Sequence, residues 1–254
     1  MTAKTQAEPA EKAELLRERI VVGVIAAVLL VFWMSVFRGP MVLAVTAAIG
    51  AIMVTELFLM IAHQRYLYAI VVASLTAAAI WFSGRDALGV AALLVPLIFV
   101  IGWFVAPASW RVLFPVYVVV LTIGCLSVFL LRETGLLFSF WPALIAVATG
   151  VGAYAGKRLF GGGTVAGLVL AAVAGAVAAP FLEPEHSVLF WIIASAVLAV
   201  AALAGDAAEV NFKRRAGVVW ASDILPGYGG LLDLFKGMII TFALANLAVM
   251  AGII

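Results

Sequence analysis

The chain has 254 residues, of which 67% are hydrophobic and 11% are charged, with a mean hydropathy of +1.25 and a formal net charge of +2. An ordinary soluble domain carries roughly 25% charged residues, so this composition excludes a water-soluble globular protein. The small net charge also gives no basis for nucleic-acid binding. Composition therefore predicts an integral membrane protein.

Apolar stretches that are long enough to cross a bilayer recur along the whole chain. A helix needs about 20 mostly apolar residues to cross roughly 30 Å of hydrocarbon. Membrane barrel strands would alternate in polarity, and the continuous apolar run 21–36 does not alternate. We therefore predict an all-α polytopic bundle of about nine transmembrane helices. Their approximate ranges are 20–37, 40–62, 67–82, 88–106, 112–131, 136–154, 164–182, 188–205 and 238–254.

The positive charges predict the orientation of this bundle. If residues 1–19 form a cytoplasmic tail and 20–254 a single transmembrane domain, most Lys and Arg side chains fall on the cytoplasmic side. Only Arg38, Arg85 and Arg132 then lie outside. This bias is typical of the positive-inside rule. We predict a multi-pass protein of the cell inner (cytoplasmic) membrane with a cytoplasmic N-terminus.

One acidic residue, Glu56, lies well inside the second predicted span. An ionised side chain at that depth costs roughly 2.5–3.5 kcal/mol on insertion scales, so Glu56 should face the bundle interior. Both a functional role and a purely hydrogen-bonding role fit this position.

Two cytoplasmic segments, 150–163 and 206–236, are the candidate site segments. In the second, Asp206 and Glu209 are three residues apart and share a helix face. Lys213 and Arg214 follow one turn later and are suited to holding phosphate oxygens. In the first, Lys157 and Arg158 precede three glycines that could form a small anion-binding nest, although a flexible connector also fits them.

The remainder of the longer segment contains a turn and a further carboxylate. Residues 226–230 read Pro-Gly-Tyr-Gly-Gly, which predicts a tight turn, and Asp233 follows at a membrane boundary. Carboxylates and basic residues beside a bilayer favour metal-assisted phosphate chemistry on a lipid head group. The alternative is that the basic residues only determine topology and the glycines only form turns.

Residues 206–233 closely resemble the C-terminal signature of the phosphatidate cytidylyltransferase (CDP-diacylglycerol synthase) family. The matching positions are Lys213-Arg214, Ala216-Gly217, Pro226-Gly227, Gly229-Gly230 and Asp233. Upstream, Gly152-Ala153-Tyr154, Gly156 and Leu159-Phe160-Gly161 are similar to a second family element. The two motifs occur in the family's order on a compatible multi-span background.

The resemblance implies that the phosphate of phosphatidic acid attacks the α-phosphorus of CTP, with Mg²⁺ bound by aspartates and pyrophosphate as the leaving group. It also implies a homodimer surrounded by membrane lipids. The implied catalytic residues are Asp206, Glu209 and Asp233, and the implied metal ligands are Asp233 and Asp223. The implied phosphate-binding residues are Lys213, Arg214, Tyr228, Gly229, Gly230, Lys157 and Arg158.

The chain departs from the family pattern at reactive positions. The family has Lys-Asp where this chain has Val219-Trp220, histidine at Tyr228 and aspartate at Lys236. A lysine in place of an anion inverts the local charge. A rival hypothesis is therefore a catalytically inactive relative that binds lipid or a partner. A transporter is a third hypothesis, but the spans carry few polar residues near their midpoints.

Overall fold

The computed structural model describes residues 4–62, 65–85, 88–182, 186–222, 224–225 and 229–254. Within these residues the chain forms nine α-helices and one short 3-10 turn, with no β-strand. The prediction of an all-α polytopic bundle is confirmed. The helices are α1 Lys4–Val36, α2 Pro40–Ile61, α3 Tyr66–Ser83, α4 Leu88–Val105, α5 Leu113–Thr134, α6 Leu136–Phe160, α7 Gly163–Leu182, α8 Val188–Ala216 and α9 Leu231–Met250.

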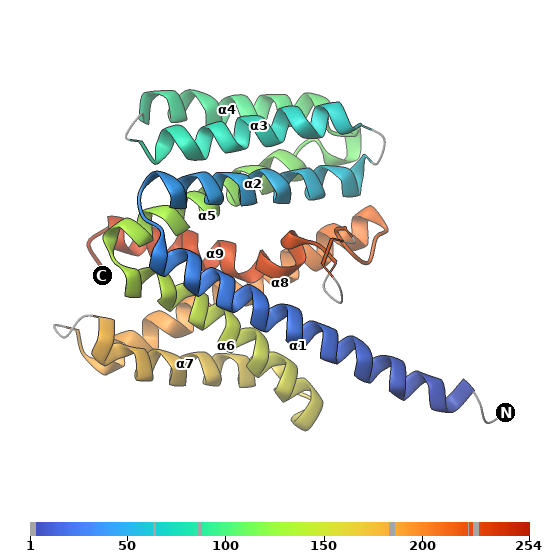
Figure 1. The fold of residues 1–254 in the computed structure, drawn as a ribbon, viewed down its shortest axis with the longest axis vertical. Helices are drawn as coiled ribbons and strands as arrows, with labels where there is room; N and C mark the ends of the chain where they lie inside the picture. Colours follow the sequence, from blue (N-terminus) through green and yellow to red (C-terminus); the bar gives the residue numbers. More distant parts are fainter. Residues whose placement is uncertain (1–3, 63–64, 86–87, 183–185, 223, 226–228) are drawn as a thin grey trace.

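Seven of the described helices, all except α1 and α4, are long and apolar enough to cross a membrane. The predicted first and fourth spans correspond to shorter apolar stretches among the described residues, Val21–Val36 and Ala92–Val105. In Figure 1 helices α2, α3 and α4 run nearly parallel, whereas α1 and α6 slant across the view. The start of α1 and the end of α9 lie on opposite sides of the bundle in this view.

Four helix ends differ from the predicted spans by six residues or more: the start of α1, the end of α6, the end of α8 and the start of α9. The last two form the site. Helix α8 continues eleven residues past 205, to Ala216, and ends where Gly217 adopts a left-handed conformation with φ 72°. Three basic residues in its last turn complement the negative end of the helix dipole. Helix α9 begins at Leu231, seven residues before the predicted start at 238. Hydropathy missed both extensions because they carry charged side chains.

The core has two parts that meet at α9. One part packs α2 to α5 together and includes Leu232 and Ile239 of α9. The other packs α6 to α8 together and includes Phe242 and Ala245 of α9. Large apolar side chains such as Val28 are exposed, as expected of surfaces that face lipid. Helix α9 is therefore held from both sides, which fixes the residues at its N-terminus.

Helices α6 and α7 pack through glycines that face one another. In α6 these are Gly152 and Gly156, and in α7 they are Gly163 and Gly167. A Cβ atom on Gly152 would lie 2.7 Å from the carbonyl oxygen of Ala166, so the backbones are in close contact. Small residues at four-residue spacing allow this kind of approach in membranes. These glycines of the predicted 150–163 site segment thus pack the bundle.

Candidate phosphate-binding site at the ends of helices α8 and α9

The last turns of α8 and the first turns of α9 bring acidic and basic side chains together. On α8, the Lys213 ammonium lies 2.5 Å from Oε1 of Glu209, one turn earlier. The same ammonium forms an ion pair with Oδ1 of Asp233 on α9. The Lys236 ammonium lies 3.2 Å from Oε2 of Glu209. We call Glu209, Lys213, Asp233 and Lys236 the lysine–carboxylate cluster.

The cluster is largely removed from solvent. The side chains of Glu209 and Asp233 are 1% and 4% exposed, and that of Lys213 is 11% exposed, whereas Lys236 is 31% exposed. Buried charges are costly unless they are paired and hydrogen-bonded. Each carboxylate is paired with an ammonium, whereas Oε1 of Glu209 and Oδ1 of Asp233 are buried without a hydrogen-bond partner among the described residues. These four side chains carry two negative and two positive formal charges, and Asp206, which interacts electrostatically with Lys236, adds a further negative charge to this region.

Asp233 also organises the backbone that precedes α9. Its Oδ2 accepts hydrogen bonds from the backbone N–H of Gly230 and of Ala221, each at 3.1 Å. Leu225 and Gly229 exchange two backbone hydrogen bonds of 2.7 and 2.8 Å, and Gly229 has φ 95°. The residues on either side of 226–228, Leu225 and Gly229, are therefore held together by backbone hydrogen bonds, while 226–228 of the predicted turn lie outside the described residues. Asp233 satisfies one N–H at the start of α9 while its other oxygen contacts Lys213.

The buried carboxylate of Glu56 reaches the N-terminus of α9 from α2. It accepts hydrogen bonds from the backbone N–H of Leu231 at 3.1 Å and of Leu232 at 2.8 Å, and from the Ser222 hydroxyl at 2.8 Å. Gly230 packs against it, because a Cβ there would lie 2.6 Å from Oε2 of Glu56. Glu56 thus faces the interior as predicted. Its carboxylate lies at the N-terminus of α9, where a negative charge interacts favourably with the positive end of the helix dipole.

Aromatic side chains cover the α8 side of the cluster. The ring of Phe212, next to Lys213, lies 4.4 Å from that of Trp110 and 5.3 Å from that of Tyr117. The Lys213 ammonium lies 5.8 Å from the centroid of the Trp220 ring. Trp220 stands where the family resemblance expects an aspartate. The Trp220 ring forms a cation–π interaction with Lys213, at the position where an aspartate would offer a carboxylate.

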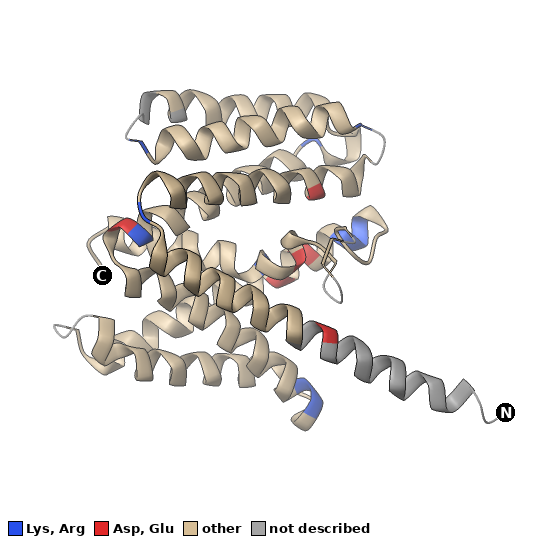
Figure 2. Cartoon of the chain, in the orientation of Figure 1, with Lys and Arg blue, Asp and Glu red and all other residues tan. Residues whose placement is uncertain are grey.

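The remaining predicted site residues have different surroundings. Asp206 faces α9, since a Cβ on Gly237 would lie 3.2 Å from its Oδ1. Arg214 is exposed at the end of α8. Lys157 and Arg158 are exposed in the last turn of α6, and that end of α6 lies apart from the end of α8 (Figure 2).

The glycines of the predicted turn are part of the loop before α9, since the Gly230 N–H donates to Asp233 and the Gly229 N–H donates to Leu225. Tyr228 and Asp223 lie outside the described residues.

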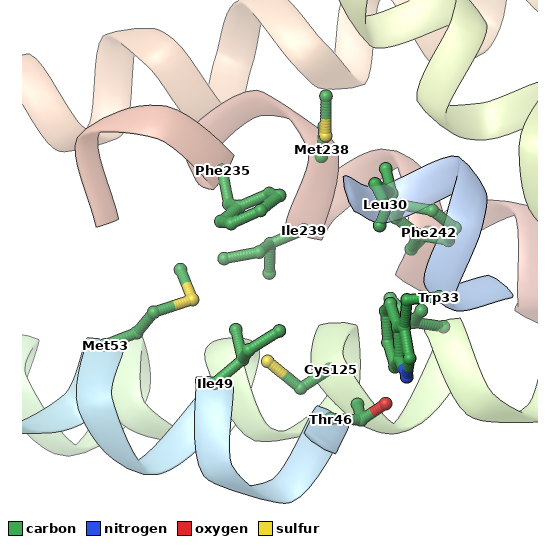
Figure 3. Close-up of a pocket in the computed structure, with 11 residues that line it drawn as sticks. Leu30, Trp33, Thr46, Ile49, Met53, Cys125, Phe235, Met238, Ile239 and Phe242 are labelled. Carbon is green, nitrogen blue, oxygen red and sulfur yellow. The ribbon is translucent and has the colours of Figure 1, made fainter. Parts of the chain in front are cut away.

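A hollow lies in the bundle between α1, α2, α5 and α9 (Figure 3). Its lining is formed by apolar side chains such as Met53, Ile239 and Phe242, together with Thr46 and Cys125. The Thr46 hydroxyl donates to the carbonyl oxygen of Val42. This lining offers no charged group to a phosphate. The cluster at the ends of α8 and α9 is the better candidate for phosphate chemistry.

The resemblance implies a Mg²⁺ ion, for which the carboxylates of Glu209 and Asp233 are the candidate ligands among the described residues. Mg²⁺ takes six oxygen ligands in near-octahedral geometry, with one or two carboxylates among them. Among the described residues, no three His, Cys, Asp or Glu side chains are grouped so that they could hold a metal ion. Both Glu209 and Asp233 are already paired with ammonium groups. These side chains do not fit a divalent cation as they are arranged.

Two features of the site were not recognised in the sequence. One is the contact of Glu56 with α9, which joins residues more than 170 positions apart. The other is the pairing of Lys236 with Glu209, because 236 was placed in a loop before the ninth span. A helix beginning at Leu231 places Asp233 and Lys236, three residues apart, on one face, and this spacing is the signal that could have placed Lys236 beside the carboxylates.

Comparison with known proteins agrees with the motif evidence. The model of the cytidylyltransferase family matches residues 17–251. Phosphatidate cytidylyltransferase from Staphylococcus saprophyticus is 29% identical over 139 residues, covering 49% of this chain and 54% of the relative. The enzyme of that name from Helicobacter pylori is 31% identical over 121 residues, covering 42% and 45%. The chain spans about half the length of the curated relatives it matches. Because the family model covers nearly all of the described helices, this membrane protein belongs to the cytidylyltransferase family.

Proposed function

We propose that this protein transfers the cytidylyl group of CTP to phosphatidate. A phosphate oxygen of phosphatidate would form a bond to the α-phosphorus of CTP, the bond to the β-phosphate oxygen would break, and pyrophosphate would leave. The product is CDP-diacylglycerol. Two findings support this proposal: the family match over residues 17–251 and the shared name of the relatives.

The observation that carries the placement of this activity is the lysine–carboxylate cluster beside the exposed Arg214. A planar guanidinium can bind two phosphate oxygens at once. Arg214 and Arg215 are both exposed here, and Arg214 is the one that matches the family motif, whereas Lys213 is held by two carboxylates. We therefore assign first contact with phosphate to Arg214. Lys213 would support it with a fixed positive charge.

The protein's location follows from the same proposal. CTP is a cytoplasmic nucleotide and phosphatidate is a membrane lipid, so the end of α8 would face the cytoplasm at the inner membrane. This is the orientation that the positive-inside rule predicts. The homodimer implied by the resemblance stays a prediction.

A second candidate function is lipid binding without turnover. The observation that favours it is the engagement of Glu209 and Asp233 with Lys213 and Lys236, which leaves neither carboxylate free for a metal ion. Such a relative would keep the head-group site and lose the transfer step. Phosphatidate would then bind in the absence of CTP and remain unchanged.

A turnover assay distinguishes the two candidates. The purified full chain in detergent receives radiolabelled CTP, phosphatidate and Mg²⁺, and labelled CDP-diacylglycerol is measured. Transfer predicts product in proportion to enzyme, and Asp233→Asn should abolish it. Arg214→Gln should raise KM at least about tenfold, whereas Arg215→Gln, at the neighbouring exposed position, should leave KM nearly unchanged. Absence of product above background would eliminate transfer and leave lipid binding.

A further inference from the structure

The cations of the lysine–carboxylate cluster are supplied by the chain itself. We propose that Lys213 and Lys236 together take the place of a divalent cation at Glu209 and Asp233, so that this carboxylate pair does not bind Mg²⁺ or Mn²⁺. The inference concerns the cluster alone and holds whether or not CTP is turned over.

The carboxylate oxygens of Glu209 and Asp233 already contact other groups of the chain. In Glu209, Oε1 pairs with Lys213 and Oε2 pairs with Lys236. In Asp233, Oδ1 pairs with Lys213, and Oδ2 accepts two backbone hydrogen bonds. All four oxygens are therefore contacted by an ammonium group or by backbone N–H groups, although Oε1 of Glu209 and Oδ1 of Asp233 have the ion pair and no hydrogen bond. A metal ion would have to displace at least one ammonium to reach them.

The charges of the cluster also disfavour a bound metal ion. The pair carries two negative charges, which one divalent cation or two ammonium groups would balance. With both lysines in place and Asp206 interacting with Lys236, an added Mg²⁺ would leave an excess of one positive charge in a largely buried site. Like charges brought this close in a region of low dielectric repel strongly. The cluster therefore disfavours a metal ion on electrostatic grounds as well as by occupancy.

Lys236 can pair with Glu209 because α9 begins at Leu231, seven residues before the start that hydropathy predicts. Position 236 lies one turn inside α9, on the face that carries Asp233 and packs against α8. An aspartate there would place a third carboxylate next to Glu209. Such a set of oxygens is what a hard divalent cation requires. The side chain at 236 therefore decides whether this site holds a metal ion or an internal cation.

Metal binding can be measured directly, without CTP or lipid substrate. Mn²⁺ is titrated into the purified full chain in detergent, and free Mn²⁺ is followed by electron paramagnetic resonance. The variants are Glu209→Gln, Lys236→Asp and Lys236→Met. Size-exclusion profiles and helical circular dichroism check that each variant is folded.

The wild-type protein should bind Mn²⁺ no more tightly than Glu209→Gln does. Lys236→Asp should bind one Mn²⁺ at least about tenfold more tightly than wild type, and adding Glu209→Gln to it should remove this gain. Lys236→Met removes the cation without adding an oxygen ligand and should gain less than Lys236→Asp. Two results would overturn the proposal: stoichiometric Mn²⁺ binding by the wild type that Glu209→Gln abolishes, or no gain in folded Lys236→Asp. Failure of the turnover assay would leave both readouts unaffected.

Discussion

The contact between Glu56 and the start of α9 gives the sharpest test of how the site is held. Glu56→Ala removes the acceptor for two backbone N–H groups and the Ser222 hydroxyl. Hydrogen bonds to a charged group contribute about 1.5–3 kcal/mol each in soluble proteins, whereas interhelical hydrogen bonds in membranes average about 0.6. Loss of a helix N-cap alone costs about 1 kcal/mol. We expect Glu56→Ala to lower the free energy of unfolding by about 2–4 kcal/mol.

Glu56→Gln should have a smaller effect, because the amide retains one oxygen. If that oxygen takes the place of Oε1, the hydrogen bonds from Ser222 and Leu231 remain and the one from Leu232 is lost. We expect a loss of about 1–2 kcal/mol. The free energy is measured by unfolding in mixed detergent micelles with increasing SDS. Hydrogen exchange of the Leu231 and Leu232 amides should accelerate in the same order, with alanine faster than glutamine.

The matched control is Glu133→Ala at the exposed end of α5. It removes the same charge from an exposed side chain, whereas the Leu231 and Leu232 amides donate to Glu56, and its free energy of unfolding should stay within about 0.5 kcal/mol of wild type. Equal stability of Glu56→Ala and Glu133→Ala would refute the account of Glu56 as the group that holds α9.

Three further substitutions, and one control, test the packing and a helix end. Gly152→Ala should destabilise the protein by about 1–3 kcal/mol in the same unfolding assay, because its Cβ meets backbone atoms of α7. The control Gly150→Ala, with no atom within 4 Å of its Cβ, should be neutral or stabilising, and the reverse order of stabilities would contradict the close approach of α6 and α7. Arg132→Met removes a 2.6 Å hydrogen bond from Nε to the Met34 carbonyl oxygen. Disulfide crosslinking between one cysteine introduced into α1 and one introduced into α5 should therefore fall, and unchanged crosslinking would mean that other contacts hold α1. Gly217→Ala forces a side chain into φ 72° and should cost about 1 kcal/mol, with unchanged stability arguing against this helix end.

The transmembrane architecture was predictable because hydropathy responds to the same property that selects a bilayer. Seven helices satisfy the length and composition expected of spans, and most helix ends lie within a few residues of the predicted ends. Hydropathy failed where helices continue through charged residues. Lys213 at the end of α8 and Asp233 at the start of α9 lie in helices that the polar composition placed in a loop.

The site was predictable at the level of its residues and less so at the level of their contacts. Spacing placed Asp206 and Glu209 on one face, and the structure directs Asp206 towards Gly237 and Glu209 towards Lys236, both on α9. The role of Glu56 could not be read from the sequence, because it depends on how α2 packs beside α9. The predicted 150–163 segment was assigned to the site from a motif, whereas Gly152 packs α6 against α7. A motif identifies residues that matter to a family but does not separate packing from chemistry.

Binding of phosphatidate to the exposed end of α8 tests the central claim most directly, because both candidate functions require it. Phosphatidate and phosphatidylcholine are titrated separately onto the purified protein, and bound lipid is counted by native mass spectrometry. The account predicts tighter binding of phosphatidate, a loss of at least about tenfold in Arg214→Gln and little change in Arg215→Gln. Equal binding of the two lipids, or phosphatidate binding that Arg214→Gln leaves intact, would contradict the placement of the phosphate site.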